Sequence, residues 1–272
     1  MQITSTSNPR IKQIRKLRER KEREQSGLFF IEGLKIVGEA IQTEAAVECL
    51  LVAPDVLSSD FGNELVIASQ KKGIELIELN PAVFAHLALK ENPQGIAAVL
   101  RQRWNQLTEI DLHADGIWIA LDEIADPGNL GTILRTSDSV GAKGVILLDH
   151  CTDPYDPTSI RASMGAIFSQ KLVRCSFEQF IQWEKAMDFL LVGTSDRSSD
   201  DYQSLKYPAR LILLMGSERQ GLPFNHIQLC DEMVSIPMVG RSDSLNLAVA
   251  TAVVLYEVHN QHRRLPQGAS QK

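Results

Sequence analysis

The stretches DPGNLGTILR (residues 126–135), MGSERQGLP (residues 215–223) and IPMVGRSDSLN (residues 236–246) decide the fold of this chain. Each follows a short apolar run and contains a polar turn with glycine. Short apolar runs are typical of buried parallel strands, which are apolar on both faces because helices cover both. Ligands of such sheets bind beyond the carboxyl ends of the strands. We therefore expect the three loops to converge on one ligand site if their strands lie side by side.

The bulk composition predicts a cytoplasmic globular protein. The chain has 272 residues, of which 44% are hydrophobic and 23% charged, enough for two domains with separate cores. No apolar stretch approaches the roughly 20 residues that cross a bilayer, and the polar, basic N-terminus does not resemble a secretory signal. The 4 cysteines are scattered without a Cys-x-x-Cys pair, as are the 6 histidines, so we expect reduced thiols and no metal site.

Positive charge is concentrated near the N-terminus. The net charge is -6, but residues 9–24 hold 8 basic and 3 acidic side chains, so this segment carries +5 and the rest -11. A basic helix on an acidic body can bind a phosphate backbone, although a solvated surface helix has the same composition. The candidates for RNA contact in this segment are Arg10, Lys12, Arg15 and Lys16.

The apolar periodicity predicts an α/β protein of two domains. We predict a basic helix within residues 1–26, a small α/β domain over 27–103, a linker over 104–115, a larger α/β domain over 116–265 and a disordered tail over 266–272. In the small domain the predicted strands are 28–31, 47–52, 74–79 and 95–100, and the predicted helices are 33–42, 59–72 and 81–88. In the larger domain the predicted strands are 117–121, 144–148, 189–192, 211–215 and 234–236, and the predicted helices are 130–140, 159–168, 177–187 and 245–259.

The glycine pattern excludes two familiar nucleotide-binding folds. No Gly-x-Gly-x-x-Gly follows the first strand of the larger domain, and no Gly-Lys-Ser/Thr phosphate loop occurs. The sequence therefore gives no support to two candidate functions, NAD-dependent hydride transfer and the hydrolysis of ATP. Ser244 stands where an N-cap belongs before the last helix, and Asp243 is a competing candidate.

Motifs shared with one family are spread over nearly the whole chain. They are Asn129-x-Gly131-x-x-x-Arg135, Gly216-x-Glu218-x-x-Gly221, and Ile236-Pro237-Met238-x-Gly240 followed by Ser244-Leu245-Asn246. This set, in this order, resembles the three motifs of the SpoU-type RNA ribose 2′-O-methyltransferases of the SPOUT superfamily. Residues 161–166 also resemble a stretch usual in that family. Residues 7–12 and 30–33 are similar to the opening of its ribosomal-RNA branch, whose N-terminal module has an L30e-like fold and binds RNA.

The resemblance implies a trefoil-knotted catalytic domain that works as a homodimer and binds S-adenosylmethionine. By this resemblance the cofactor is held by segments around Leu214, Met215, Gly216, Gly221, Ile236, Met238 and Leu245. An adenine read by main-chain groups in an apolar slot fits the aliphatic and glycine content of these segments. The resemblance also makes Arg161 a candidate for RNA contact.

Arg135 matches the catalytic arginine of the family, and Asn129, Glu218, Ser244 and Asn246 fill the other polar motif positions. A guanidinium stays protonated in nearly all proteins, so we favour an Arg135 that clamps the adjacent RNA phosphate and orients the 2′-oxygen. An arginine that itself acts as the base requires a severely lowered pKa. Asn129 and Ser244 are also plausible as plain helix caps.

Two further functions compete with an RNA 2′-O-methyltransferase that acts on ribosomal RNA. Transfer RNA is the nearest alternative substrate, and a non-catalytic RNA-binding or ribosome-assembly protein on the same fold is a different class. The intact motif residues argue against a non-catalytic protein. The sequence names neither the nucleotide that is methylated nor the proton acceptor, and it does not tell naked RNA from an assembly intermediate.

Overall fold

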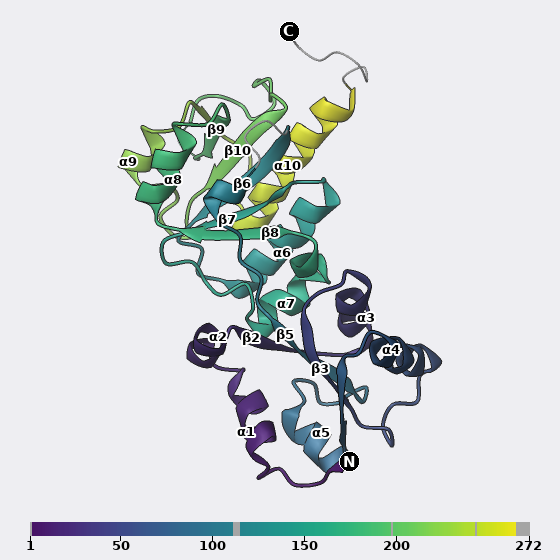
Figure 1. Ribbon diagram of the computed structural model, residues 1–272. Coiled ribbons are helices and arrows are strands. Elements are labelled where there is room, and N and C mark those ends of the chain that lie inside the picture. The colour runs from purple at the N-terminus through teal and green to yellow at the C-terminus, as the bar shows by residue number, and fades with distance from the viewer. Residues whose placement is uncertain (1, 111–114, 197, 243, 265–272) are drawn as a thin grey trace. The chain divides into compact units, whose positions relative to one another are not determined.

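The computed structural model describes residues 2–110, 115–196, 198–242 and 244–264 (Figure 1). The chain divides into two compact units, which we treat separately. The first unit comprises residues 1–103 and 153–169, and the second comprises residues 104–152 and 170–272. The predicted tail over 266–272, residues 111–114 of the predicted linker and Asp243 lie outside the described residues. No described helix is long and apolar enough to cross a membrane.

The first unit is built on a mixed sheet with the strand order β1-β4-β3-β5-β2. Its elements are β1 (Gln2–Ile3), α1 (Pro9–Lys16), α2 (Arg20–Ser26), β2 (Leu28–Glu32), α3 (Leu34–Gln42), β3 (Val47–Val52), α4 (Asp60–Lys71), β4 (Glu75–Leu79), α5 (Pro81–Leu87), β5 (Ile96–Arg101), α7 (Pro157–Ser163) and η2 (Ala166–Phe168). Strand β5 runs antiparallel to both β3 and β2, and the other pairs are parallel. The predicted strands and helices of this region are all present.

The predicted N-terminal helix is in fact two helices, α1 and α2. Its apolar residues Ile11, Ile14 and Leu17 are buried against the sheet and α5, as their spacing predicts. Arg23, which we counted with the basic surface, is only 1% exposed. Its Nη1 donates to the carbonyls of Leu17 and Arg18, the orphan acceptors at the end of α1. Arg23 therefore stabilises the break between the helices and is not available to RNA.

A buried ion pair fixes the position of Arg23. Its Nε donates to the carboxylate of Asp153 over 2.7 Å, and both side chains are almost fully buried. The neighbouring Asp156 accepts from Nη2 over 3.4 Å and also caps α7 by accepting from the backbone of Thr158. Removing one partner of a buried pair leaves an uncompensated charge, so these residues tie the segment 153–169 to α2.

The second unit contains a six-stranded, fully parallel sheet with the order β11-β9-β10-β6-β7-β8. Its elements are η1 (Leu107–Glu109), β6 (Gly116–Asp122), α6 (Pro127–Ser139), β7 (Gly144–Leu148), β8 (Lys171–Cys175), α8 (Phe177–Glu184), β9 (Leu190–Thr194), β10 (Arg210–Met215), α9 (Phe224–Ile227), β11 (Glu232–Val234) and α10 (Leu247–Arg264). Helices α8 and α9 lie on one side of the sheet, and α6 and α10 lie on the other (Figure 1).

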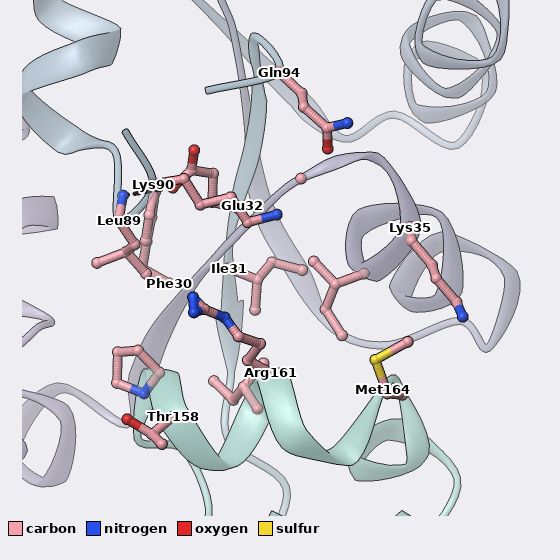
Figure 2. Close-up of a pocket in the computed structure, with 14 residues that line it drawn as sticks. Phe30, Ile31, Glu32, Lys35, Leu89, Lys90, Gln94, Thr158, Arg161 and Met164 are labelled. Carbon is pink, nitrogen blue, oxygen red and sulfur yellow. Dashed lines mark hydrogen bonds between the residues drawn. The ribbon is translucent and has the colours of Figure 1, made fainter. Parts of the chain in front are cut away.

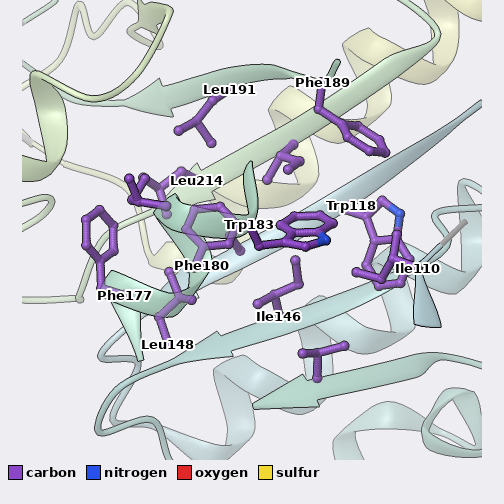
Figure 3. Close-up of a cluster of buried hydrophobic side chains, with 14 of the residues drawn as sticks. Ile110, Trp118, Ile146, Leu148, Phe177, Phe180, Trp183, Phe189, Leu191 and Leu214 are labelled. Carbon is purple, nitrogen blue, oxygen red and sulfur yellow. The ribbon is translucent and has the colours of Figure 1, made fainter. Parts of the chain in front are cut away.

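Aromatic side chains fill the core between the sheet and α8 (Figure 3). Phe180 and Trp183 of α8 pack there with Trp118 of β6 and Phe189 at the start of β9. Every second residue of the strands points into this layer, as alternation along a strand requires. On the opposite face α10 packs against α6, which bears the first motif. Both faces of the sheet are covered, so its central strands β6, β7 and β10 are almost entirely apolar.

Candidate active site

The three motif loops all leave the same edge of the parallel sheet. The loop at 123–126 follows β6, the loop at 216–223 follows β10, and the loop at 235–246 follows β11. Strands β6 and β10 are direct neighbours, whereas β9 lies between β10 and β11. Because all six strands are parallel, their carboxyl ends meet at one edge, where ligands of α/β sheets bind.

The second motif is a tight loop that closes on itself. Ser217 and Gly221 exchange two backbone hydrogen bonds, of 3.2 and 3.0 Å. A side chain at Gly216 would place its Cβ 2.2 Å from the backbone carbon of Gly221, and Gly221 itself has a φ of +65°. Both glycines are therefore required by the backbone. The closed loop presents Glu218 at its tip.

Glu218 joins the second motif to the first. Its carboxylate accepts hydrogen bonds from the backbone nitrogens of Ala125 and Asp126, each over 3.2 Å, and from the side-chain amide of Asn129 over 3.1 Å. Burial raises the pKa of the Glu218 carboxyl, but the hydrogen bonds from Asn129, Ala125 and Asp126 outweigh it and hold that pKa below its ordinary value. Glu218 is therefore an exposed carboxylate whose position is held by three hydrogen bonds.

Asn246 joins the third motif to the same network. Its side-chain amide donates to Oδ1 of Asn129 over 3.0 Å. Its own Oδ1 accepts from the backbone nitrogens of Ala248 and Val249, so Asn246 caps α10. Our expectation that Ser244 is this cap is wrong, because α10 begins at Leu247, two residues later than predicted. Ser244 is an exposed residue of the preceding loop.

Helix α6 begins three residues earlier than predicted, at Pro127. Asp126 is its N-cap and accepts from the backbone nitrogens of Gly128 and Asn129. Asn129 therefore stands in the first turn and is not the cap. The missed signal is the Asp-Pro pair, because aspartate is favoured at the N-cap and proline at the first helical position.

Arg135 lies in the third turn of α6, because the helix begins at Pro127 and not at residue 130 as predicted. Leu130, Ile133 and Leu134 of this helix are fully buried, whereas Arg135 is exposed. Among the residues that the structure describes, no hydrogen bond or ion pair engages the guanidinium of Arg135. The cation is thus free to bind an anionic ligand.

The segments expected to hold the cofactor contain both buried and exposed residues. Leu214 and Met215 end strand β10 and are buried, as is the backbone at Gly216. Met238 and Leu245 are each 38% exposed, and Ile236 is half-buried. Aliphatic side chains beside a closely approached glycine backbone suit an adenosyl group, so these residues fit the cofactor that the motifs imply. Within the described ranges no cluster of three or more potential metal ligands occurs.

Three of the four basic residues near the N-terminus that we expect to contact RNA have partners within the first unit; the fourth is Lys12. Arg10 forms a forked ion pair with Glu75, and Arg15 shares a hydrogen bond with His86. Lys16 lies 3.7 Å from Glu22. All these groups are near the surface, so the pairs are weak and can be exchanged for phosphate contacts. Arg161 belongs to α7, in the first unit.

Comparison with known protein families assigns both parts of the chain. Residues 116–256 match the model of the SpoU rRNA methylase family, and residues 8–98 match the MRM3-like substrate-binding domain. The chain belongs to the SpoU rRNA methylase family. It is 33% identical to a 23S rRNA uridine 2′-O-methyltransferase of Streptomyces viridochromogenes, a match that covers 89% of this chain and 86% of the relative. It is 30% identical to a 23S rRNA guanosine 2′-O-methyltransferase of Bacillus subtilis over 94% of this chain and 98% of the relative.

A solved structure agrees with this assignment. The crystal structure of an AdoMet-bound rRNA methyltransferase from Sinorhizobium meliloti superimposes with a TM-score of 0.87 and 35% identity, over 96% of this chain and 97% of that one. The predicted family, α/β methyltransferase fold, enzyme class and S-adenosylmethionine cofactor are therefore confirmed. The trefoil knot implied by the resemblance stays a prediction.

Proposed function

We propose that this protein methylates a ribose 2′-hydroxyl of ribosomal RNA, with S-adenosylmethionine as the methyl donor. The observation that carries this proposal is the hydrogen-bonded chain Glu218–Asn129–Asn246, which joins all three family motifs at one edge of the sheet. Both relatives described above are named for 2′-O-methylation of 23S rRNA. One of them acts on uridine and the other on guanosine, so family membership does not fix the base.

The ribose hydroxyl is a poor nucleophile that must be aligned and must lose its proton. The bound cofactor would supply an electrophilic methyl group on a sulfonium centre. Alignment of reactants can lower a barrier by roughly 7–11 kcal/mol in well-oriented systems, so positioning is the main task of the protein. We assign to Arg135 the clamping of an RNA phosphate beside the reacting ribose, because its guanidinium is exposed, charged and free.

Asn129, Glu218 and Asn246 act as positioning residues in this proposal. Glu218 fixes the amide of Asn129 by accepting its N–H, and Asn246 donates to the opposite end of the same amide. The orientation of Asn129 is thus determined from both sides. Ser244, on the exposed loop before α10, is assigned to contact with the ribose or the cofactor. Leu214, Met215, Gly216, Gly221, Ile236, Met238 and Leu245 are proposed to hold the cofactor.

We propose that the first unit binds the RNA and that the protein is a cytoplasmic homodimer. Arg10, Lys12, Arg15, Lys16 and Arg161 are the proposed RNA contacts.

The support for a dimer is apolar surface on α10, where Val249 and Tyr256 are 48% and 47% exposed and share one helix face. Such exposed apolar faces mark protein contacts. Light scattering on the purified protein should give twice the chain mass.

The direct test is incorporation of labelled methyl groups into RNA. Purified protein, S-adenosylmethionine and protein-free ribosomal RNA should yield a 2′-O-methylated nucleoside after complete nuclease digestion. Asn129→Ala should abolish the product, and Gln220→Ala, an exposed neighbour of Glu218 in the second motif, should not. Methylation of transfer RNA only would move the substrate to the alternative class, and cofactor binding without methylation of either RNA would favour a non-catalytic protein.

A further inference from the structure

A cavity of about 470 Å³ lies within the first unit, and no residue of the three methyltransferase motifs lines it (Figure 2). It is formed by β2, the first turn of α3, the loop after α5, and α7. Phe30, Ile31, Ile160 and Met164 give it apolar walls. This volume falls within the range of about 300–1,000 Å³ that is usual for small-ligand sites.

One oxygen of a carboxylate that lines the cavity is buried and has no hydrogen-bond partner. Glu32 ends β2 and is only 7% exposed. One of its oxygens, Oε2, accepts from the backbone nitrogen of Leu89, but Oε1 is buried without a hydrogen bond. An unsatisfied buried acceptor is costly, so such a group indicates a ligand that brings an N–H or O–H donor.

Three cations stand at the rim of the same cavity: Lys35, Lys90 and Arg161. Each is exposed, and among the described residues none of them has an ion-pair partner. Lys90 approaches Gly33 closely, since its Nζ lies 3.0 Å from the position that a Cβ on Gly33 would occupy. Figure 2 shows the guanidinium of Arg161 extending from α7 towards Phe30 and Ile31. The cavity thus combines apolar walls, one buried acceptor and a cationic rim.

We propose that this cavity receives a single nucleobase turned out of the substrate RNA, with its neighbouring phosphates on Lys35, Lys90 and Arg161. Unstacked bases are bound by aromatic side chains, apolar walls and guanidinium planes, and read on their pairing edges. Every nucleobase has an N–H donor on that edge, which would satisfy Oε1 of Glu32. The cationic rim matches a polyanion better than a neutral metabolite.

The base held here is an anchor and not the nucleotide that is methylated. None of the motif residues Asn129, Arg135, Glu218 or Asn246 lines the cavity, and all four belong to the second unit. This inference rests on the proposed function, because it assumes an RNA substrate. It adds a specific site and ligand chemistry to the general role of the first unit.

The decisive variant is Glu32→Gln. Its amide oxygen can keep the hydrogen bond from Leu89, whereas its NH₂ group takes the place of Oε1 and can no longer accept the N–H of a base. The matched control is Glu64→Gln, which removes the same charge from the exposed face of α4 in the same unit. With protein-free 23S rRNA as probe, we expect the affinity of Glu32→Gln to fall about tenfold, equivalent to about 1.4 kcal/mol, and that of the control to stay within twofold.

A crosslinking measurement locates the contact independently. Ribosomal RNA transcribed with 4-thiouridine or 6-thioguanosine is irradiated with the wild-type protein, and crosslinked peptides are identified by mass spectrometry. We expect adducts within residues 30–36 or 162–164, and their loss in Glu32→Gln. Adducts only elsewhere, or equal RNA affinity of Glu32→Gln and Glu64→Gln, would overturn the inference.

Two controls separate this proposal from neighbouring ones. Methyl incorporation is measured on the same samples: a wild-type protein that methylates no RNA refutes the proposed function, whereas normal methylation with an unaffected Glu32→Gln refutes only the cavity. Titration with UMP, CMP, AMP and GMP should show no binding below millimolar concentration. Micromolar binding of any of them, lost in Glu32→Gln, would make the cavity a mononucleotide site instead.

Discussion

Replacing Glu218 with alanine should separate the stability of this protein from its activity. The substitution removes three hydrogen bonds of 3.1–3.2 Å, two from the backbone at the start of α6 and one from Asn129. Hydrogen bonds to charged groups contribute about 1.5–3 kcal/mol each when they are buried. Glu218 is exposed, so water replaces much of each bond, and we expect a total loss of about 1–2 kcal/mol.

The loss of activity should be much larger than this stability change suggests. Without Glu218, only the contact with Asn246 holds the side chain of Asn129, and the second motif is no longer tied to the first. Misplacement of reacting groups by about 1 Å can slow a reaction about 100-fold. We therefore expect kcat for methyl transfer to fall about 10–100-fold, with the melting temperature lowered by roughly 2–8 °C.

The assay is initial-rate methyl transfer at saturating cofactor and RNA, with calorimetric melting of the same preparations. Arg219→Ala is the matched control, since it truncates the adjacent exposed side chain of the same loop. A Glu218→Ala protein whose kcat is within twofold of the wild-type value would refute the reasoning, because the hydrogen bonds of Glu218 to the first motif would then not be needed for catalysis.

Three further outcomes follow from the geometry. Arg135→Lys should keep the charge but lose the planar fork, so kcat should fall at least tenfold with unchanged cofactor affinity by calorimetry; undiminished turnover would show that the guanidinium is not needed. Gly216→Ala should lower the free energy of unfolding by about 3 kcal/mol in urea titrations, because its Cβ meets the backbone of Gly221; wild-type stability would contradict the close approach. Burial, together with the charge of Asp231, raises the pKa of Glu184 to about 7, so Glu184→Gln should stabilise the protein at pH 8 by about 1–2 kcal/mol and progressively less as the pH falls towards 4.5; a benefit that grows at low pH would contradict this sign.

The parallel core was predictable because its strands are continuous apolar runs. Residues 144–148 form a strand with the predicted bounds, and the runs at 117–121 and 211–215 lie inside slightly longer strands. Strand β8 was missed because Lys171 and Arg174 interrupt its apolar pattern; β8 is the last strand of the sheet, and both of these side chains are exposed. Strand β1 has only two residues and makes no periodic signal.

The helix boundaries were less predictable than the helices because they depend on single side chains. We expected the cap of α10 at Ser244, with Asp243 as the competing candidate, whereas Asn246, also a residue type favoured at caps, takes that role. The split between α1 and α2 was invisible because it depends on Arg23, whose ion-pair partner Asp153 is 130 residues away in the chain. A tertiary contact of this kind leaves no local pattern.

The cap at Asn246 explains why an asparagine stands at this position in the third motif. The side-chain oxygen of Asn246 satisfies the first free N–H groups of α10, which leaves its amide nitrogen to bind Asn129. A serine could cap the helix, but its one hydroxyl proton and short reach would not serve both contacts as well. Capping and site assembly are therefore one function of a single side chain. Asn246→Ser should thus retain most of the helix stability and lose turnover, whereas equal activity would show that the bond to Asn129 has no role in catalysis.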